Sequence, residues 1–220
     1  MTAARFARLS SILDRRQPDL TVLLDDLQKA HNVSAVIRTC DAVGIPTIHA
    51  VTDAATFKAK TTSAAGSERF VEVHLRPSYR DAVEHLHAAG FHVVAAHQSA
   101  RSVDFRSIDY TRPVCVAMGQ EGPGVSAGLL DVVDAEIEIP MVGAVASLNV
   151  SVATAVVLFE AQRQRRAAGF YDQPRLDPTE RHRLLFEWGY PKLARFCQDK
   201  GIAYPELGER GEIVGEMPRG

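Results

Sequence analysis

Residues 114–128 read VCVAMGQEGPGVSAG, an apolar run followed by a glycine-rich turn and then by small and polar residues. This order predicts a buried strand at residues 114–118, a turn at residues 119–124 and a short helix at residues 126–133. Strands that alternate with helical patterns elsewhere in the chain favour an α/β fold with a mostly parallel sheet. In such sheets ligands bind at the carboxyl ends of the strands, so the glycine-rich turn is the first candidate site.

The rest of the chain carries patterns that predict the other elements of this fold. Further strands are expected at residues 21–24, 47–51, 70–75, 91–96 and 135–139, and further helices at residues 5–16, 31–44, 79–89 and 148–168. Asn32 is expected near the N-cap of the second of these helices, and Ser147 is the expected N-cap of the last. The final stretch, residues 199–220, is acidic and rich in glycine and proline, which is typical of a loosely packed tail.

Composition restricts the class of protein. The chain has 220 residues, of which 46% are hydrophobic and 24% charged, so a folded globular protein is expected and dominant disorder is excluded. Its apolar runs are too short to span a membrane, and its first nine residues lack the apolar core of a secretory signal. The three cysteines (Cys40, Cys115 and Cys197) fit neither a disulfide framework nor a zinc motif, which favours a reducing, cytoplasmic compartment and no metal.

Positive charge gathers toward both ends of the chain, although the formal net charge is −2. The net charge argues against indiscriminate nucleic-acid binding but leaves room for a local basic patch. One interpretation is a surface for RNA built from the terminal helices, and the simpler one is a set of solvated helix faces. The arginines that would form this surface are Arg8, Arg15, Arg16, Arg163 and Arg166.

Three interpretations compete for the glycine-rich turn. Gly119 and Gly124 have the spacing of a phosphate-binding loop, but Val125 stands where that motif needs lysine. Residues 124–128 match the G-x-S-x-G motif of serine hydrolases, with Ser126 as the nucleophile, yet the serine lies too far from the strand for that motif. Ser126 is more simply the N-cap of the next helix. We favour a third interpretation, in which glycines let the backbone approach a small ligand closely.

Two further polar residues are ambiguous when the residues alone are considered. Ser34, Arg38 and Asp41 share one helix face, so Arg38 either forms a surface pair with Asp41 or binds a phosphate. Asn149 stands in the first turn of the long helix, where its amide is placed to bind a neighbouring turn or a ligand.

Three segments in register change the balance between these interpretations. They are NVSAVIRTC at residues 32–40, GQEGPG at residues 119–124 and SLNVS at residues 147–151. Their order and spacing resemble the three motifs of the SPOUT RNA ribose methyltransferases. The resemblance covers nearly the whole chain and is greatest to the branch that methylates guanosine 18 of tRNA, as the stretches at residues 15–44, 147–166 and 184–206 indicate.

This resemblance implies a SPOUT fold whose mostly parallel sheet carries a C-terminal deep trefoil knot. It implies an N-terminal helical arm at residues 1–18, a methyltransferase domain at residues 19–170 and a C-terminal helical extension at residues 171–220. It also implies a homodimer whose sites are completed by the partner, with S-adenosylmethionine bent in the knot. The residues expected to hold this methyl donor are Ala96, Gly119, Ile139, Met141, Ser147 and Leu148.

The implied reaction transfers a methyl group to the ribose 2'-hydroxyl of guanosine 18 in tRNA. The resemblance assigns catalytic or site-shaping roles to Arg38, Asn32, Glu121 and Asn149, and we expect Lys58, Lys60 and Arg69 to lie near tRNA phosphates. Because arginine stays protonated, we expect Arg38 to bind phosphate and stabilise the developing alkoxide rather than remove a proton. Three alternatives stay open: another position in tRNA or rRNA, a serine hydrolase, and an RNA-binding module without chemistry.

Overall fold

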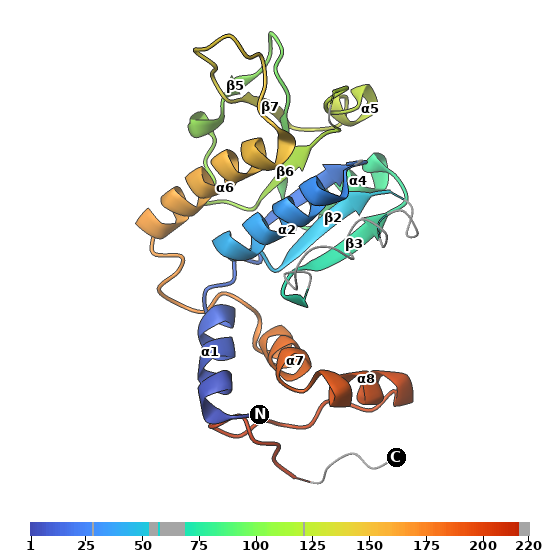
Figure 1. Cartoon of the computed structure of the whole chain (residues 1–220), viewed down its shortest axis with the longest axis vertical. Helices are drawn as coiled ribbons and strands as arrows, with labels where there is room; N and C mark the ends of the chain where they lie inside the picture. Colours follow the sequence, from blue (N-terminus) through green and yellow to red (C-terminus); the bar gives the residue numbers. More distant parts are fainter. Residues whose placement is uncertain (28, 53–56, 58–68, 121, 216–220) are drawn as a thin grey trace. The chain divides into compact units, whose positions relative to one another are not determined.

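The computed structural model describes residues 1–27, 29–52, 57, 69–120 and 122–215. The chain divides into two compact units, shown with their elements in Figure 1. The larger unit comprises Gln17–Gly169, and the smaller combines Met1–Arg16 with Phe170–Gly220.

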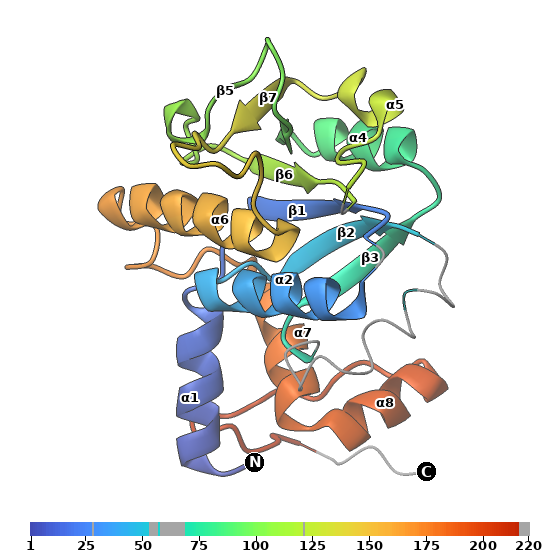
Figure 2. The ribbon, with the colours of Figure 1, turned by 45° about the horizontal axis from the view of Figure 1, so that its top comes forward.

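A seven-stranded sheet forms the centre of the larger unit. Its strand order is β3-β2-β1-β6-β4-β7-β5, and every pairing between its strands is parallel. The strands are β1 (Leu20–Asp25), β2 (Thr47–Val51), β3 (Glu72–Arg76), β4 (His92–Ala96), β5 (Val103–Asp104), β6 (Val114–Met118) and β7 (Ala135–Glu138). The predicted α/β fold with a mostly parallel sheet is therefore confirmed, and Figure 2 shows β1 beside β6 at its centre.

Helices cover both faces of this sheet, as a parallel sheet with two apolar faces requires. They are α2 (Ala30–Val43), α4 (Tyr79–Ala88), α5 (Ala127–Leu130) and α6 (Val150–Ala167), with a 3-10 helix, η2, at Phe105–Ser107. One apolar core joins α2 and α6 to strand residues such as Val22 and Val116, and α2 and α6 lie side by side (Figure 1). A second core joins α4 and α5 to the alternate strand residues, among them Leu23 and Cys115.

The structure corrects the predicted N-cap of α6 and places Asn32 near the N-cap of α2, as expected. The N-cap of α6 is Asn149 rather than Ser147, because the Asn149 Oδ1 atom accepts hydrogen bonds from the Ser151 N–H at 2.9 Å and the Ser151 hydroxyl at 2.6 Å. The helix α2 begins after Lys29, so Asn32 lies within its first turn and is buried. Ser34 is buried too, which separates it from the exposed face that carries Arg38.

The smaller unit is built from α1 (Ala3–Leu13), α7 (Pro178–Gly189) and α8 (Pro191–Lys200). Arg181 pairs with Asp14 at 2.8 Å, and this ion pair joins α7 to the end of α1. The expected loose tail is wrong for its described part. The Tyr204 ring stacks on Phe186 with centroids 4.7 Å apart, and the Gly211 carbonyl accepts a hydrogen bond from the Tyr190 hydroxyl at 2.7 Å.

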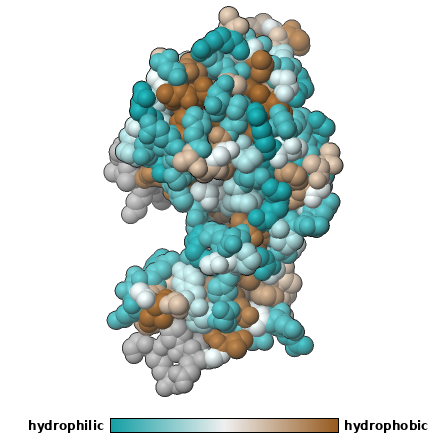
Figure 3. All heavy atoms as spheres, turned by 180° about the vertical axis from the view of Figure 1, so that it is seen from behind, coloured by the Kyte–Doolittle hydropathy of each residue, from teal (hydrophilic) through white to brown (hydrophobic). Residues whose placement is uncertain are grey.

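Hydrophobic and hydrophilic residues are interspersed on the surface that Figure 3 displays. None of the helices in the described ranges combines the length and hydropathy that crossing a bilayer demands. The three cysteines all lie in described ranges, where each is a buried thiol outside any disulfide.

Candidate active site

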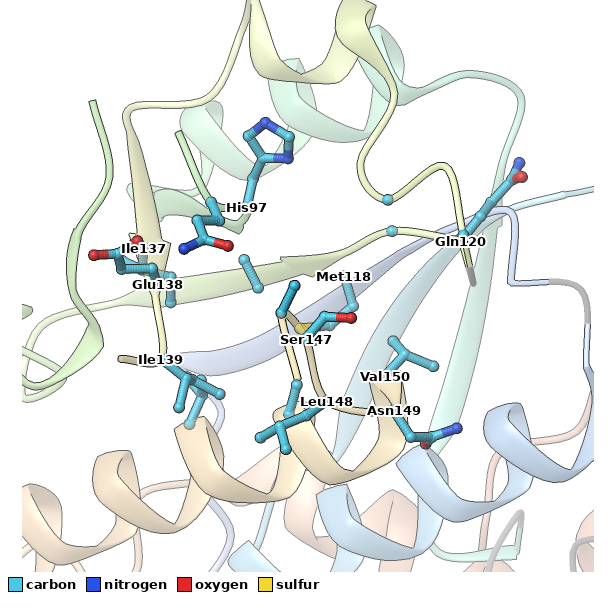
Figure 4. Close-up of a pocket in the computed structure, with 18 of the residues that line it drawn as sticks. His97, Met118, Gln120, Ile137, Glu138, Ile139, Ser147, Leu148, Asn149 and Val150 are labelled. Atoms are coloured by element: carbon cyan, nitrogen blue, oxygen red, sulfur yellow. The ribbon is translucent and has the colours of Figure 1, made fainter. Parts of the chain in front are cut away.

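A cavity of about 410 Å³ opens at the carboxyl ends of β4, β6 and β7. Three segments line it: residues 96–98 after β4, the turn after β6, and the connection from β7 to α6 (Figure 4). All six residues predicted to hold a methyl donor lie in this lining, namely Ala96, Gly119, Ile139, Met141, Ser147 and Leu148. The carboxyl-end location matches the general rule for ligand sites in parallel sheets.

The turn after β6 is a closed loop whose neck is very tight. Two backbone hydrogen bonds of 2.9 and 3.1 Å join Gln120 and Gly124 across the neck. A Cβ atom at Gly119 would lie 2.1 Å from the Gly124 carbonyl carbon and from the Val125 nitrogen. Glycine at position 119 is therefore required by the loop's own backbone, and not by the approach path of a ligand as the sequence interpretation supposed.

Two carboxylates at the end of β1 hold this loop from outside. The Asp26 Oδ2 atom accepts a hydrogen bond from the Gln120 side-chain amide at 3.0 Å, and the Asp25 Oδ2 atom accepts one from the Ser126 N–H at 2.8 Å. Ser126 is the N-cap residue of α5, as predicted, but its hydroxyl forms no capping hydrogen bond. Its backbone N–H, rather than its side chain, is therefore the group that anchors this point.

A hydrogen bond between the buried Asn32 and the exposed Asn149 joins α2 to α6 beside the cavity. The Asn149 Nδ2 group donates a hydrogen bond of 3.3 Å to the Asn32 Oδ1 atom. Asn149 also lines the cavity, and Figure 4 shows it at the start of α6 beside the first turn of α2. This bond brings two of the predicted site residues together and links the cavity wall to the helix that carries Arg38.

Arg38 is exposed on α2 and is not a lining residue of the cavity. No hydrogen bond or ion pair joins it to the described residues, so the surface pair with Asp41 that the sequence allowed is not formed there. Its guanidinium keeps its donors available to an anion from outside the chain.

A network of carboxylates supports the β7 wall of the cavity. The pKa of Glu136 lies below its usual value, chiefly because the Ser99 hydroxyl donates a hydrogen bond of 2.6 Å, with further help from the Arg101 guanidinium. Glu138, two residues along, lines the cavity and accepts a hydrogen bond from the Ser102 hydroxyl at 3.1 Å. The wall therefore presents an anchored carboxylate to any ligand in the cavity.

Comparison with known proteins identifies the family to which the chain belongs. The family model described as "SpoU rRNA Methylase family" matches residues 19–159, and that described as "SpoU, rRNA methylase, C-terminal" matches residues 163–216. The chain belongs to the SpoU rRNA methylase family.

Named relatives within this family are similar over most of the chain. The tRNA (guanosine(18)-2'-O)-methyltransferase of Escherichia coli strain K12 is 49% identical over 218 residues, covering 98% of this chain and 95% of that protein. The crystal structure of the A. aeolicus TrmH/SpoU tRNA modifying enzyme is 37% identical with a TM-score of 0.78, covering 86% of this chain and 96% of that one. An AdoMet-bound rRNA methyltransferase from Sinorhizobium meliloti is 33% identical with a TM-score of 0.58, covering 70% and 59%.

Membership of the SpoU family leaves the serine-hydrolase interpretation without support. Ser126 serves as an anchor point for the loop, as described above, and His182, the only histidine that follows it in the sequence, belongs to the smaller unit. The glycine-rich turn is therefore a cavity wall of a methylase, in agreement with the interpretation we favoured.

The predicted RNA-contacting arginines have different surroundings. Arg8, Arg15, Arg69 and Arg166 are exposed, and Arg163 is exposed but pairs with Glu160 at 2.7 Å. Arg16 corrects the prediction, because it is buried and its guanidinium lies 5.3 Å from the centre of the Trp188 ring. Its charge stacks inside the smaller unit instead of facing solvent. Glu121, Lys58 and Lys60 lie outside the described residues.

Sequence reasoning missed lining residues that belong to the strands themselves. Met118 and Glu138, the last residues of β6 and β7, line the cavity, whereas His97, Gln98 and Gln120 lie in the loops at residues 96–98 and 119–124 that the resemblance implies. The rule that ligands bind where parallel strands end gives the signal that could have found them. Among the described residues, no cluster of three metal-binding side chains is present.

Proposed function

We propose that this chain transfers a methyl group from S-adenosylmethionine to the ribose 2'-hydroxyl of guanosine 18 in tRNA. The observation that carries the proposal is the cavity built by the three strand ends and lined by all six expected residues, in a chain 49% identical to a tRNA (guanosine(18)-2'-O)-methyltransferase. A relative named for rRNA, the 23S rRNA (guanosine-2'-O-)-methyltransferase of Pseudomonas syringae, is 36% identical over 73% of this chain, against 49% over 98% for the Escherichia coli tRNA enzyme. We therefore place tRNA ahead of rRNA as the substrate.

The lining of the cavity suits S-adenosylmethionine. Apolar side chains such as Met118, Ile139 and Leu148 offer walls for an adenine ring, and the loop backbones offer polar groups to its edges. Glu138 supplies a carboxylate that can accept hydrogen bonds from hydroxyl groups. When bound, S-adenosylmethionine supplies a methyl group already activated by its sulfonium, so the residues of this chain need only position and activate the acceptor.

Arg38 performs the electrostatic part of that task in our proposal. An arginine remains protonated, so it binds a phosphate beside the target ribose and stabilises the negative charge that develops on the 2'-oxygen. Asn32 and Asn149, hydrogen-bonded to each other, fix α2 against the cavity wall and so fix the helix from which Arg38 projects. The 2'-hydroxyl proton passes to an acceptor within hydrogen-bond reach, for which the adjacent phosphate is our candidate.

We also propose that the active form is a homodimer. Exposed apolar side chains lie on the connection from β7 to α6 and on α6 itself. They are Val142 and Val145 on the connection, and Val152 and Phe159 on the helix. Val152 and Phe159 are seven residues apart, so they share one helix face and form an apolar strip that a second copy would cover. Because Arg38 lies outside the lining of its own cavity, we place it at the partner's site.

The remaining assignments complete this proposal. The exposed arginines Arg8, Arg15, Arg69 and Arg166, with Lys58 and Lys60, would contact tRNA phosphates, and residues 171–220 would act with residues 1–18 as RNA-binding extensions. The chain from β6 through α6 would form the trefoil knot of the family. A cytoplasmic location accords with a tRNA substrate and three thiols outside any disulfide.

Methyl transfer to an unmodified tRNA transcript, with mapping of the methylated nucleotide, tests the proposal. We expect label from S-adenosylmethionine at guanosine 18, and no label in a matched transcript that carries 2'-deoxyguanosine there. Calorimetry with S-adenosylmethionine and a chelator should give unchanged binding. Methylation at a different nucleotide, or binding that the chelator abolishes, would contradict the assignment.

A further inference from the structure

The loop after β6 is held at both of its ends by two consecutive carboxylates, one from the last residue of β1 and one from the residue that follows it. Asp26 binds the Gln120 side chain near the beginning of the loop, and Asp25 binds the Ser126 N–H at its end, at 3.0 and 2.8 Å. Within the loop, the paired backbones of Gln120 and Gly124 close the neck. The loop is thus fixed internally by its backbone and externally by the end of β1.

Asp26 has a backbone conformation that is unusual for a residue with a side chain. Its φ is 51°, and it is the only non-glycine residue with a positive φ among those that the structure describes. Aspartate tolerates this left-handed region better than most residues, but glycine adopts it with less strain. The chain therefore keeps a carboxylate where the backbone alone favours glycine, and glycine at this position would lose the hydrogen bond to Gln120.

The anchored loop forms one wall of the cavity, since Gly119, Gln120, Gly122 and Gly124 all line it. A shift of this wall changes the shape that a ligand meets, whereas neither Asp25 nor Asp26 lines the cavity itself. We infer that Asp25 and Asp26 are positioning residues, which fix the loop in the form that binds the methyl donor. This inference rests on the proposed function and assigns that function two residues which the three family-like segments do not contain.

Substitutions at both ends of one hydrogen bond test the inference in the full-length protein. Asp26→Gly removes the carboxylate and relieves the backbone, Gln120→Ala removes the same bond from the loop side, and Asp26→Asn keeps an acceptor and tolerates the left-handed region. Asp109→Gly is the control, because among the described residues that exposed carboxylate accepts hydrogen bonds only from Thr111, two residues along the chain. The readouts are calorimetric affinity for S-adenosylmethionine, KM and kcat, tRNA affinity and thermal midpoint.

We expect Asp26→Gly and Gln120→Ala each to weaken S-adenosylmethionine binding about tenfold, the size of one hydrogen bond to a charged group. The double variant should bind no more weakly than Asp26→Gly, because that variant already removes the bond to Gln120. KM for S-adenosylmethionine should rise with the dissociation constant, while kcat at saturation, tRNA affinity and thermal midpoint stay near wild type. Asp26→Asn and Asp109→Gly should bind like the wild type.

Several outcomes would overturn the inference. Unchanged donor affinity in Asp26→Gly, or losses that add in the double variant, would show that the bond does not position the loop. If Asp26→Gly fails to fold, Gln120→Ala alone decides, since it leaves the β1 backbone untouched. A wild-type protein that neither binds S-adenosylmethionine nor methylates tRNA would instead contradict the proposed function. If the wild type is active and the Asp26→Gly and Gln120→Ala variants bind S-adenosylmethionine as tightly as it does, only this inference is contradicted.

Discussion

Two arginines, Arg165 on α6 and Arg38 on α2, occupy opposite kinds of surroundings on neighbouring helices. Arg165 is fully buried, and each of its five N–H donors has an acceptor. The acceptors are the Tyr110, Asp19 and Arg112 carbonyls at 2.8, 2.9 and 3.0 Å, the Gln17 side chain at 3.2 Å and the Asp19 carboxylate at 2.5 Å. Arg38 is exposed and binds none of the described residues.

The difference separates an arginine that holds the fold from one that awaits a ligand. Arg165 joins the end of α6 to the segments that precede β1 and β6. Its guanidinium donors are therefore occupied by acceptors inside the protein. The guanidinium of Arg38 binds none of the described residues. A phosphate is the partner that best matches the planar, two-donor geometry of this group. A charge count treats the two alike, and only their surroundings distinguish structure from function.

The largest effect on stability is expected from replacing the buried Arg165. Arg165→Met should lower the free energy of unfolding by about 3–5 kcal/mol, because it leaves the Asp19 carboxylate and several carbonyls without their donor. Arg163→Met, two residues away, is the control, since Arg163 only pairs with Glu160 at the surface and should cost less than about 1 kcal/mol. Urea unfolding of both variants measures the difference, and equal losses would refute the structural role of Arg165.

Replacing the exposed Arg38 is expected to lower the rate of methyl transfer without lowering the stability of the protein. Arg38→Ala should slow methyl transfer at least 100-fold, equivalent to about 3 kcal/mol of transition-state stabilisation, while thermal midpoint and S-adenosylmethionine affinity stay unchanged. Arg38→Lys should recover little, because an ammonium group cannot reproduce the bidentate fork. Single-turnover assays on tRNA measure the effect. An Arg38→Ala protein with normal turnover would contradict the mechanism.

Mixed dimers sharpen the position of Arg38. Subunits with Arg38→Ala are combined with subunits that cannot bind the methyl donor, and activity is measured in the heterodimer. If Arg38 completes the partner's site, one of the two sites has a donor and an arginine and regains activity. If Arg38 serves its own subunit, every site lacks one component and the heterodimer stays inactive.

Two glycines in the loops near the cavity, Gly119 and Gly143, differ in the same way, because a side chain would meet close neighbours at the first and empty space at the second. Gly119→Val should weaken S-adenosylmethionine binding by more than tenfold, because its Cβ would lie 2.1 Å from backbone atoms of Gly124 and Val125 and must displace the loop. Gly143→Ala is the control, because a Cβ there meets nothing within 4 Å. Calorimetry compares the two, and retained affinity in Gly119→Val would place the donor elsewhere.

The sequence could predict the sheet and the cavity because both follow from local patterns. Short apolar runs predicted six strands of the observed sheet, and the turn at residues 119–124 marked a strand end where ligands bind. The strand β5, of two residues, carries too little pattern to be detected. The burial of Arg16 against Trp188 and of Arg165 against Asp19 depends on residues 172 and 146 positions away, which no local pattern contains.

The smallest effect is expected at Ser126, which sequence reasoning made both a candidate nucleophile and a helix cap. Its hydroxyl forms no capping bond, so Ser126→Ala should change the free energy of unfolding by less than about 0.5 kcal/mol and leave methyl transfer intact. Asn149→Ala is the comparison, because that side chain caps α6 through the Ser151 N–H and its loss should cost about 1 kcal/mol. Urea unfolding separates the two caps. A Ser126→Ala protein as destabilised as Asn149→Ala would show that the serine hydroxyl holds a bond which the structure assigns to its backbone N–H and Asp25.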